Sequence, residues 1–184
     1  MKPKEQIVDL ADQYIRAKGY NAFSFYDIAK EVGIKTSSIH YHFPSKTDLG
    51  VAVIEKELAF ITAMIQKNAD CSPLEKLNIF FSIYHKIKEA NQVCLVGSLA
   101  TDFMTLDESI QNALKKFSLT ILNWVTGFLE EGKRENVFNF SCQPRIKALL
   151  IIGNMLSIVQ LSRLIDDADF NSVKKAIQKD LLNQ

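Results

Sequence analysis

Apolar side chains recur at three- and four-residue spacing along almost the whole chain. At the N-terminus, for example, one helix face would hold Ile7, Leu10, Ala11, Tyr14 and Ile15. Similar spacing returns in the segments that follow, and no stretch shows the strict alternation typical of a strand. Turn-forming residues are also scarce, with 7 Gly and 4 Pro in 184 residues. The sequence therefore predicts an all-α protein.

Three short helices are expected in the first part of the chain. They cover residues 4–18, 25–32 and 37–43. Gly19 would end the first helix with a left-handed cap, and Gly33 would end the second. Pro44 stops the third helix, because the residue before a proline is displaced from helical backbone angles.

Residues that can cap helix N-termini precede several helices. Ser24 and Ser45 each stand three residues before an aspartate, which is the spacing of a capping box. For the third and last helices the candidate caps are Thr36 or Ser37 and Asp169 or Asn171. Further helices are expected to start near residues 46, 73, 95, 108, 145 and 170, which makes about nine in all.

The overall composition does not by itself indicate nucleic-acid binding. The 22 Lys and Arg nearly balance the 21 Asp and Glu, and the formal net charge is +1. The strongly basic balance typical of many nucleic-acid-binding proteins is absent, so such a function must rest on local residues. No apolar run reaches the roughly 18 residues of a membrane span. We expect a soluble, cytoplasmic protein.

Cysteine and histidine spacing does not indicate a metal site. Cys71, Cys94 and Cys142 are odd in number and form no CxxC pair, and the three histidines complete no zinc pattern with them. We expect reduced thiols, no metal and no cofactor. Gly-rich phosphate loops, HExxH and GxSxG are also missing from the sequence, so we expect no catalytic residues.

The stretch GIKTSSIHYHFPSKTDLG combines hydroxyls, aromatic rings and lysines around one proline. If Ile34, Ile39 and Phe43 pack on the preceding helix, the polar side chains of the third helix are left outward. These outward residues are Thr36, Ser37, Ser38, His40 and Tyr41. Lys35 and Lys46 flank the helix, where they could neutralise phosphates. The pattern predicts a helix-turn-helix, although an ordinary helical hairpin has the same spacing.

A longer pattern is more specific. The stretch SFYDIAKEVGIKTSSIHYHFPSKTDL resembles the N-terminal domain of tetracycline-repressor-like (TetR-family) bacterial transcriptional regulators. Such proteins typically show GY or GF after the first helix, then DIAKEAGV, a short SxxxxYxHF helix and SKxxL. The matching residues are Gly19–Tyr20, Asp27–Glu31, Gly33, His42–Phe43, Ser45–Lys46 and Leu49. The resemblance is strong over residues 4–53 and generic beyond them.

The resemblance implies a role for each matching position. Base edges or the nearby backbone would be contacted by Lys35, Ser37, Ser38 and Tyr41. Phosphates would be contacted by Ser24, Tyr26, His40 and Lys46. The family usually has tyrosine where this chain has His40, and protonation of the imidazole could make operator affinity mildly pH-dependent. His42 lies next to the core face and is expected to be packed and hydrogen-bonded.

The rest of the chain is expected to form a second domain. Residues 1–45 would bind DNA, and residues 46–184 would form a helical bundle for effector binding and dimerisation. The segment ALLIIGNMLSIVQL has no charged residue, and a helix that is apolar on every face lies in a core or an interface. Few cations also favour two copies on one palindromic operator. The resemblance implies the same homodimer, formed by residues 144–165 and 170–184, although a monomer core would also bury this segment.

The middle helices are rich in aromatic residues, which usually form core. The resemblance implies that an apolar cavity among them binds a small apolar or amphipathic effector, whose binding tilts the fourth helix and releases the operator. The candidate lining residues are Phe81, Tyr84, His85, Phe103, Phe117, Trp124 and Asn154.

Cys94 stands at the start of the expected sixth helix. A helix N-terminus favours the thiolate, so Cys94 could switch a redox or electrophile sensor of the same fold, although cysteine is often just a small buried hydrophobic residue. An enzyme that pairs Cys94 with His85 would need a third, orienting group, and none is evident. A helical interaction module that has lost DNA binding is a further alternative.

Overall fold

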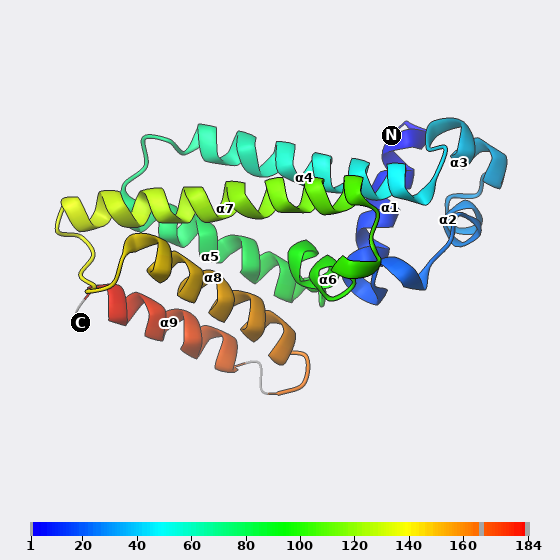
Figure 1. The fold of residues 1–184 in the computed structure, drawn as a ribbon. Coiled ribbons are helices and arrows are strands. Elements are labelled where there is room, and N and C mark those ends of the chain that lie inside the picture. The colour runs from blue at the N-terminus through cyan, green and yellow to red at the C-terminus, as the bar shows by residue number, and fades with distance from the viewer. Residues whose placement is uncertain (1, 166–167, 183–184) are drawn as a thin grey trace. The chain divides into compact units, whose positions relative to one another are not determined.

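The computed structural model describes residues 2–165 and 168–182. Those residues form nine α-helices and two single-turn 3-10 helices, and no strand occurs among them. In chain order they are α1 Pro3–Lys18, η1 Tyr20–Ala22, α2 Phe25–Val32, α3 Thr36–His42, α4 Lys46–Lys67, α5 Pro73–Glu89, α6 Leu95–Thr101, η2 Phe103–Thr105, α7 Glu108–Arg134, α8 Pro144–Leu161 and α9 Ala168–Leu182. The predicted all-α fold with about nine helices is confirmed (Figure 1).

The helices pack into two compact units. The first consists of Met1–Phe60 and Leu95–Ser118, and the second of Ile61–Cys94 and Leu119–Gln184. Two long helices, α4 and α7, each begin in the first unit and end in the second. The predicted division at residue 45 concerns binding activities rather than packing, so it stays a prediction.

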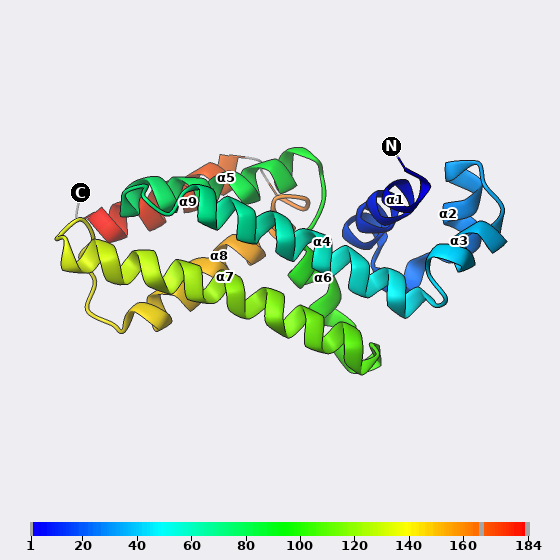
Figure 2. The same cartoon turned by 90° about the horizontal axis from the view of Figure 1, so that it is seen from above.

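In the first unit, α1 is the central element. It packs against α2, α3 and α6, and both views show α1, α2 and α3 grouped together (Figures 1 and 2). Fully buried aliphatic residues hold this group together, among them Ile7 and Ile15 of α1, Ile28 of α2 and Ile39 of α3. Each such side chain contributes about 1.5–3 kcal/mol when it leaves water. The Ser98 hydroxyl of α6 donates to the Ile15 carbonyl at 2.6 Å, which ties α6 to the end of α1.

Charged groups join α1 to the first part of α4 within this unit. The buried Arg16 guanidinium lies 2.7 Å from a carboxylate oxygen of Asp12 and 3.1 Å from one of Glu57. Lys56 of α4 also pairs with Asp9 of α1. Burial raises the pKa of the Glu57 carboxyl, and the nearby Arg16 charge acts in the opposite direction. Two ion pairs therefore hold α1 and α4 in one arrangement.

In the second unit, α8 packs against both α5 and α9. An aromatic cluster occupies the space between α5 and α7. Phe80 lies 6.0, 5.1 and 6.3 Å, centroid to centroid, from the rings of Phe81, Tyr84 and Trp124. Trp124 in turn lies 5.5 Å from Phe128, edge to face. The aromatic residues of the middle helices are therefore partly core, as their spacing predicts.

Three predicted helix ends differ from the structure. Gly19 has a φ of 94° but a ψ of 158°, a region almost restricted to glycine, and is not the left-handed cap predicted. Neither Thr36 nor Ser37 caps α3, because the turn after Gly33 is so short that Lys35 already occupies the N-cap position. Asp169 and Asn171 do not cap the last helix, since α9 begins before both at Ala168. Asp169 still lies in the first turn, where a carboxylate is favourable.

The helix α8 exposes one aliphatic face. Ala148, Ile151 and Met155 are buried, whereas Leu149 and Leu150 keep 48% and 53% of their surface exposed. Within the described ranges, α8 is the one helix whose length and composition would allow it to cross a membrane, and 28% of it is buried. This criterion is weak, because helices in the core of soluble proteins also satisfy it.

Candidate DNA-binding surface

Helices α2 and α3 are joined by a tight glycine turn. Gly33 has a φ of 76° and a ψ of 31°, the left-handed conformation that glycine adopts without strain. The backbone N–H groups of Gly33 and Ile34 both donate to the Ala29 carbonyl at 3.0 Å. Because Ile39 and Phe43 are buried, they hold α3 on α1 and α2 by one face. The opposite face of α3 is left in solvent.

The start of α2 is fixed by a reciprocal cap. The Ser24 hydroxyl accepts from the Asp27 backbone N–H at 3.4 Å, and the Ser24 N–H donates to the Asp27 carboxylate at 2.7 Å. These bonds from Ser24 lower the pKa of the Asp27 carboxyl. The predicted capping of α2 by Ser24 is confirmed, and Ser45 makes the equivalent bonds to Asp48 before α4.

Most of the predicted DNA-contacting side chains are exposed. Tyr41 keeps 85% of its surface in solvent and Tyr26 keeps 67%, although both are large and partly apolar. Ser24, Lys35 and Ser37 are also exposed, while Thr36 and Ser38 are half-buried. Exposed tyrosines and hydroxyls on α2 and α3 offer donors, acceptors and flat rings to a partner.

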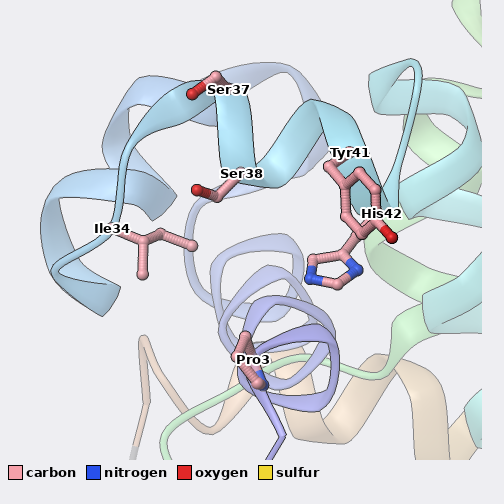
Figure 3. Close-up of a pocket in the computed structure, with 6 residues that line it drawn as sticks. All are labelled: Pro3, Ile34, Ser37, Ser38, Tyr41 and His42. Carbon is pink, nitrogen blue, oxygen red and sulfur yellow. The ribbon is translucent and has the colours of Figure 1, made fainter.

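A recess of about 430 Å³ lies beside α3. Figure 3 shows Ser37 and Ser38 in the first half of the helix and Tyr41 and His42 at its other end, with Pro3 of α1 across from them. The full lining is Pro3, Ile34, Ser37, Ser38, Tyr41 and His42. Three of the residues predicted to read base edges therefore lie around one hollow, together with the N-terminus of α1.

The two histidines of α3 have different surroundings. The His40 ring packs edge to face on Phe25, and its Nδ1 lies 3.3 Å from the Pro44 carbonyl oxygen. His42 is half-buried beside the Tyr41 ring, with 5.2 Å between the centroids. His42 is thus half-buried at the edge of the recess, and the prediction of a packed, hydrogen-bonded histidine stays a prediction.

Lys46 does not extend into solvent. Its ammonium donates to the Phe23 carbonyl at 2.5 Å and lies 4.7 and 4.4 Å from the ring centroids of Tyr20 and Phe23. Burial lowers the pKa of Lys46, and the charge of Asp27 acts in the opposite direction. A phosphate contact by Lys46 remains a prediction, but in this structure the group is bound to the protein itself.

Comparison with known proteins identifies this architecture. The family model "Bacterial regulatory proteins, tetR family" matches residues 7–53, which contain α1, α2, α3 and the start of α4. The crystal structure of a TetR transcriptional regulator from Legionella pneumophila is 38% identical, has a TM-score of 0.86 and covers 98% of both chains. The chain belongs to the TetR family. It is therefore a DNA-binding transcriptional regulator, as the N-terminal pattern predicted.

Two curated relatives share shorter segments with this TetR-family chain. An HTH-type transcriptional regulator in the lacX 3' region of Lactococcus lactis is 30% identical over 119 residues, which is 61% of each chain. IcaR, the negative transcriptional regulator of the biofilm operon icaADBC in Staphylococcus aureus, is 33% identical over 69 residues. That match covers 38% of this chain and 37% of IcaR. The chain thus spans less than two thirds of the length of either relative.

More distant solved structures share the fold. FadR of Bacillus subtilis in complex with stearoyl-CoA is 18% identical with a TM-score of 0.73, covering 96% of this chain and 98% of FadR. A regulator from Saccharomonospora viridis in complex with choline is 16% identical with a TM-score of 0.78, covering 96% and 93% of the two chains. At these identities the likeness concerns the fold alone.

The predicted effector-pocket residues of this TetR-family chain divide between the two units. Phe81, Tyr84 and Trp124 join the aromatic cluster of the second unit, while Phe103 and Phe117 belong to the first. Two of the predicted residues are exposed. His85 pairs with Glu89 at 3.3 Å and stacks on Phe170, and the Asn154 amide donates to the Leu150 carbonyl on the outer face of α8.

An open recess of about 370 Å³ lies between α5 and α9. Its lining consists of Asn78, Phe81, Ser82, His85, Lys174 and Gln178. Gln178 donates to Asn78 at 2.8 Å across the recess. Phe81 and His85 were predicted as pocket residues, whereas the other four were missed. No sequence signal marks them, because they come from helices about 100 residues apart and are ordinary polar residues on helix surfaces.

Cys94 is buried, with 8% of its surface exposed, and directly precedes α6. Burial raises the pKa of the Tyr84 phenol well above its usual value, and Cys94 adds to this effect. Among the residues that the structure describes, no group of three or more His, Cys, Asp or Glu side chains could hold a metal ion.

Proposed function

We propose that this TetR-family regulator represses transcription as a homodimer that binds a palindromic operator and is released from it by a small molecule. The observation that carries the proposal is the exposure of Tyr41 on a helix whose other face is held by buried Ile39 and Phe43. A rigid helix with exposed polar and aromatic side chains suits the major groove, where base edges are distinguishable. The regulator would act in the cytoplasm, where operator DNA is found.

The proposed contacts follow the geometry of α2 and α3. Base edges or the nearby backbone would be contacted by Lys35, Thr36, Ser37, Ser38 and Tyr41. Phosphates would be contacted by Ser24, Tyr26 and His40, which lie at the start of α2 and in the second half of α3. In this proposal residues 1–45 bind DNA, residues 46–184 bind the effector and the second subunit, and neither part is catalytic.

The outer face of α8 supports dimerisation. Ile146, Leu149 and Leu150 are each about half exposed and follow the three- and four-residue spacing of one helix face, and Leu161, also about half exposed, lies further along the same face beyond Gly153 and Ser157. Contiguous exposed aliphatic surface on a soluble protein marks an interface. We propose that residues 144–165 and 170–184 pair with the same segments of a second copy; residues 183–184 lie outside the described part of the chain.

An effector site in the second unit is supported by two features. The aromatic cluster of Phe81, Tyr84 and Trp124 offers apolar contacts, and the recess between α5 and α9 adds polar groups next to Phe81. Fold neighbours were solved with stearoyl-CoA and with choline, both of which combine apolar and polar parts. We propose a small apolar or amphipathic effector. His85 and Asn154 would contact it only if their exposed side chains turned inward.

Selection from a pool of random duplexes, followed by sequencing, tests the proposal. The expected result is an enriched palindrome whose half-sites lie about one helical turn apart. Sedimentation of the free protein should show a dimer. A monomer in solution together with an enriched single half-site would contradict the dimeric proposal, and no enrichment at low salt would contradict sequence-specific reading.

Switching by Cys94 is the alternative to a reversible effector. Substitution of Cys94 by serine separates the two, because a repressor released by reversible binding keeps its response in the C94S variant. Loss of the response to an oxidant or electrophile in C94S, with operator affinity unchanged, would instead support a cysteine switch.

A further inference from the structure

Lys46 lies at the first position of α4, where the segment that holds α2 and α3 ends. Its ammonium Nζ donates to the backbone carbonyl of Phe23 at 2.5 Å. Phe23 in turn directly precedes Ser24, the capping residue of α2. One bond therefore joins the two ends of the helix-turn-helix.

The surroundings of this ammonium form a small cage. The rings of Tyr20 and Phe23 pack edge to face with 6.3 Å between centroids, and both residues are at least nine-tenths buried. Nζ of Lys46 lies within 4.7 Å of both centroids. A cation over two ring faces is stabilised by their negative π surfaces, more so where water is excluded. The carbonyl adds a directional hydrogen-bond acceptor.

Lys35 shows the contrast. It is exposed and stands at the N-cap position of α3. Lysine can reach a phosphate because its charge lies at the end of a flexible, solvated side chain. Lys46 has lost that freedom, since it is half-buried and its ammonium already donates to the Phe23 carbonyl.

We propose that Lys46 is a positioning residue, which fixes the start of α2 relative to α4 and thereby orients α3, and that it does not neutralise a DNA phosphate. The proposal rests on the proposed reading of DNA by α3. Because Lys46 belongs to α4 and Phe23 directly precedes the cap of α2, a displacement of α4 would also move the start of α2. A side chain that swung out to a phosphate would have to leave the cage and break the bond to Phe23.

The dependence of operator binding on salt distinguishes the two roles. A lost phosphate contact reduces the slope of log K against log salt by about 0.9, or about 1.8 for a dimer. We expect Lys46→Met to keep the wild-type slope while the affinity of the folded protein falls about tenfold at every salt concentration. The matched variant Lys35→Met should reduce the slope. A reduced slope for Lys46→Met, or unchanged affinity with an unchanged slope, would overturn the proposal.

A double-mutant cycle with Phe23→Leu tests the mechanism. Phe23 is buried and lies in the cage, so Phe23→Leu and Lys46→Met should disrupt the same contact. Their effects on operator affinity should therefore not be additive. We expect the double variant to bind no more weakly than the worse single variant. If the affinity losses of the two single variants multiply in the double variant, Lys46 acts independently of the cage, contrary to the proposal.

Hydrogen exchange of the free protein tests the proposal without DNA. Lys46→Met should speed the exchange of amides in the first turns of α2, and Lys35→Met should not. Unchanged exchange there would overturn the proposal. If the wild-type protein binds no duplex, the proposed function fails, whereas the exchange measurement still decides the role of Lys46.

Discussion

Helices α3 and α8 both present an exposed face, but the chemistry of the two faces is opposite. On α3 the exposed side chains are the hydroxyl of Ser37, the imidazole of His40 and the phenol of Tyr41, with lysine at the N-cap. On α8 they include the aliphatic residues Ile146, Leu149, Leu150 and Leu161, the first three of which lie together in the first half of the helix. A polar face of hydrogen-bonding groups keeps its hydration until a partner of matching pattern replaces it, whereas an aliphatic face gains free energy from any apolar partner. The first face is suited to DNA and the second to another protein surface.

The largest effect on dimerisation and operator affinity is expected from a charge placed on the aliphatic face of α8. Leu150→Glu would place a carboxylate in the centre of the proposed interface, and an unpaired buried charge costs several kcal/mol. We expect a monomer at micromolar concentration and operator affinity reduced at least about 100-fold, which corresponds to about 2.7 kcal/mol. Sedimentation and operator titration measure these two quantities.

The control for this variant is Ala63→Glu, which adds the same charge at an exposed position of α4. It should remain dimeric. The fold of Leu150→Glu should also survive, since Leu150 is half exposed in one copy and surface substitutions usually change stability by less than about 0.5 kcal/mol. A Leu150→Glu protein that stays dimeric would show that the exposed face of α8 has another purpose.

The polar face is tested by Tyr41→Ala. A good base contact contributes about 1–3 kcal/mol, so operator affinity should fall roughly 5- to 150-fold. The free energy of unfolding should barely change, because Tyr41 is 85% exposed. Met104→Ala is the matched control, since Met104 belongs to the same unit and is 88% exposed. Equal operator affinity in the two variants would remove Tyr41 from the reading surface.

The sequence predicted these two faces unequally well. The helix α3 is short, and its outward residues follow from which neighbours are apolar, so Ile39 and Phe43 were placed in the core correctly. The helix α8 has no charged residue beyond its first turn, so the spacing of its apolar residues does not indicate which side packs on α5 and α9. Asn154, which the sequence suggested as a polar group of the pocket, lies on the exposed side, and its pocket role stays a prediction.

Contacts between distant segments were the least predictable. Nothing near Lys46 in the sequence indicates that its ammonium meets Phe23, which lies 23 residues earlier. The recess between α5 and α9 likewise combines residues whose separation no local pattern encodes. Local signals were more reliable, because a capping box involves residues three positions apart and is satisfied within one turn.

Two such capping boxes allow a matched test of stability against function. Ser24→Ala in α2 and Ser72→Ala in α5 each remove an N-cap hydroxyl, which typically costs about 1 kcal/mol of unfolding free energy. Only Ser24→Ala should also weaken operator binding, by a few-fold, because α2 supports α3 and because Ser24 is itself proposed to contact a phosphate. Urea unfolding and operator titration of both variants give the comparison, and equal operator affinity would show that the α2 cap serves stability alone.

The pH dependence of these caps has a definite sign. Hydrogen bonds from Ser24 and Ser72 lower the pKa of the Asp27 and Glu75 carboxyls below their usual values. A carboxyl whose folded-state pKa is depressed stabilises the protein above its unfolded-state pKa, and this contribution is lost as pH falls through the folded-state pKa. The stability difference between wild type and each serine variant should therefore shrink in acid. If the difference in unfolding free energy between wild type and each serine variant stays constant from neutral pH to the acid transition, it does not come from the bonds to these carboxylates.

The smallest effect is expected at His40, where the structure constrains the tautomer. Its Nδ1 lies 3.3 Å from the Pro44 carbonyl, which can only accept a hydrogen bond, so Nδ1 of the neutral ring carries the proton. Nε2 is then an acceptor and cannot bond to a phosphate, which also only accepts. Substitution of His40 should therefore change operator affinity only slightly, by at most about fivefold per copy, which corresponds to about 1 kcal/mol. Operator titration of His40→Gln measures this effect, with His85→Gln in α5 as the control. A larger loss for His40→Gln would show that its ring is needed to hold Phe25 and the turn at Pro44.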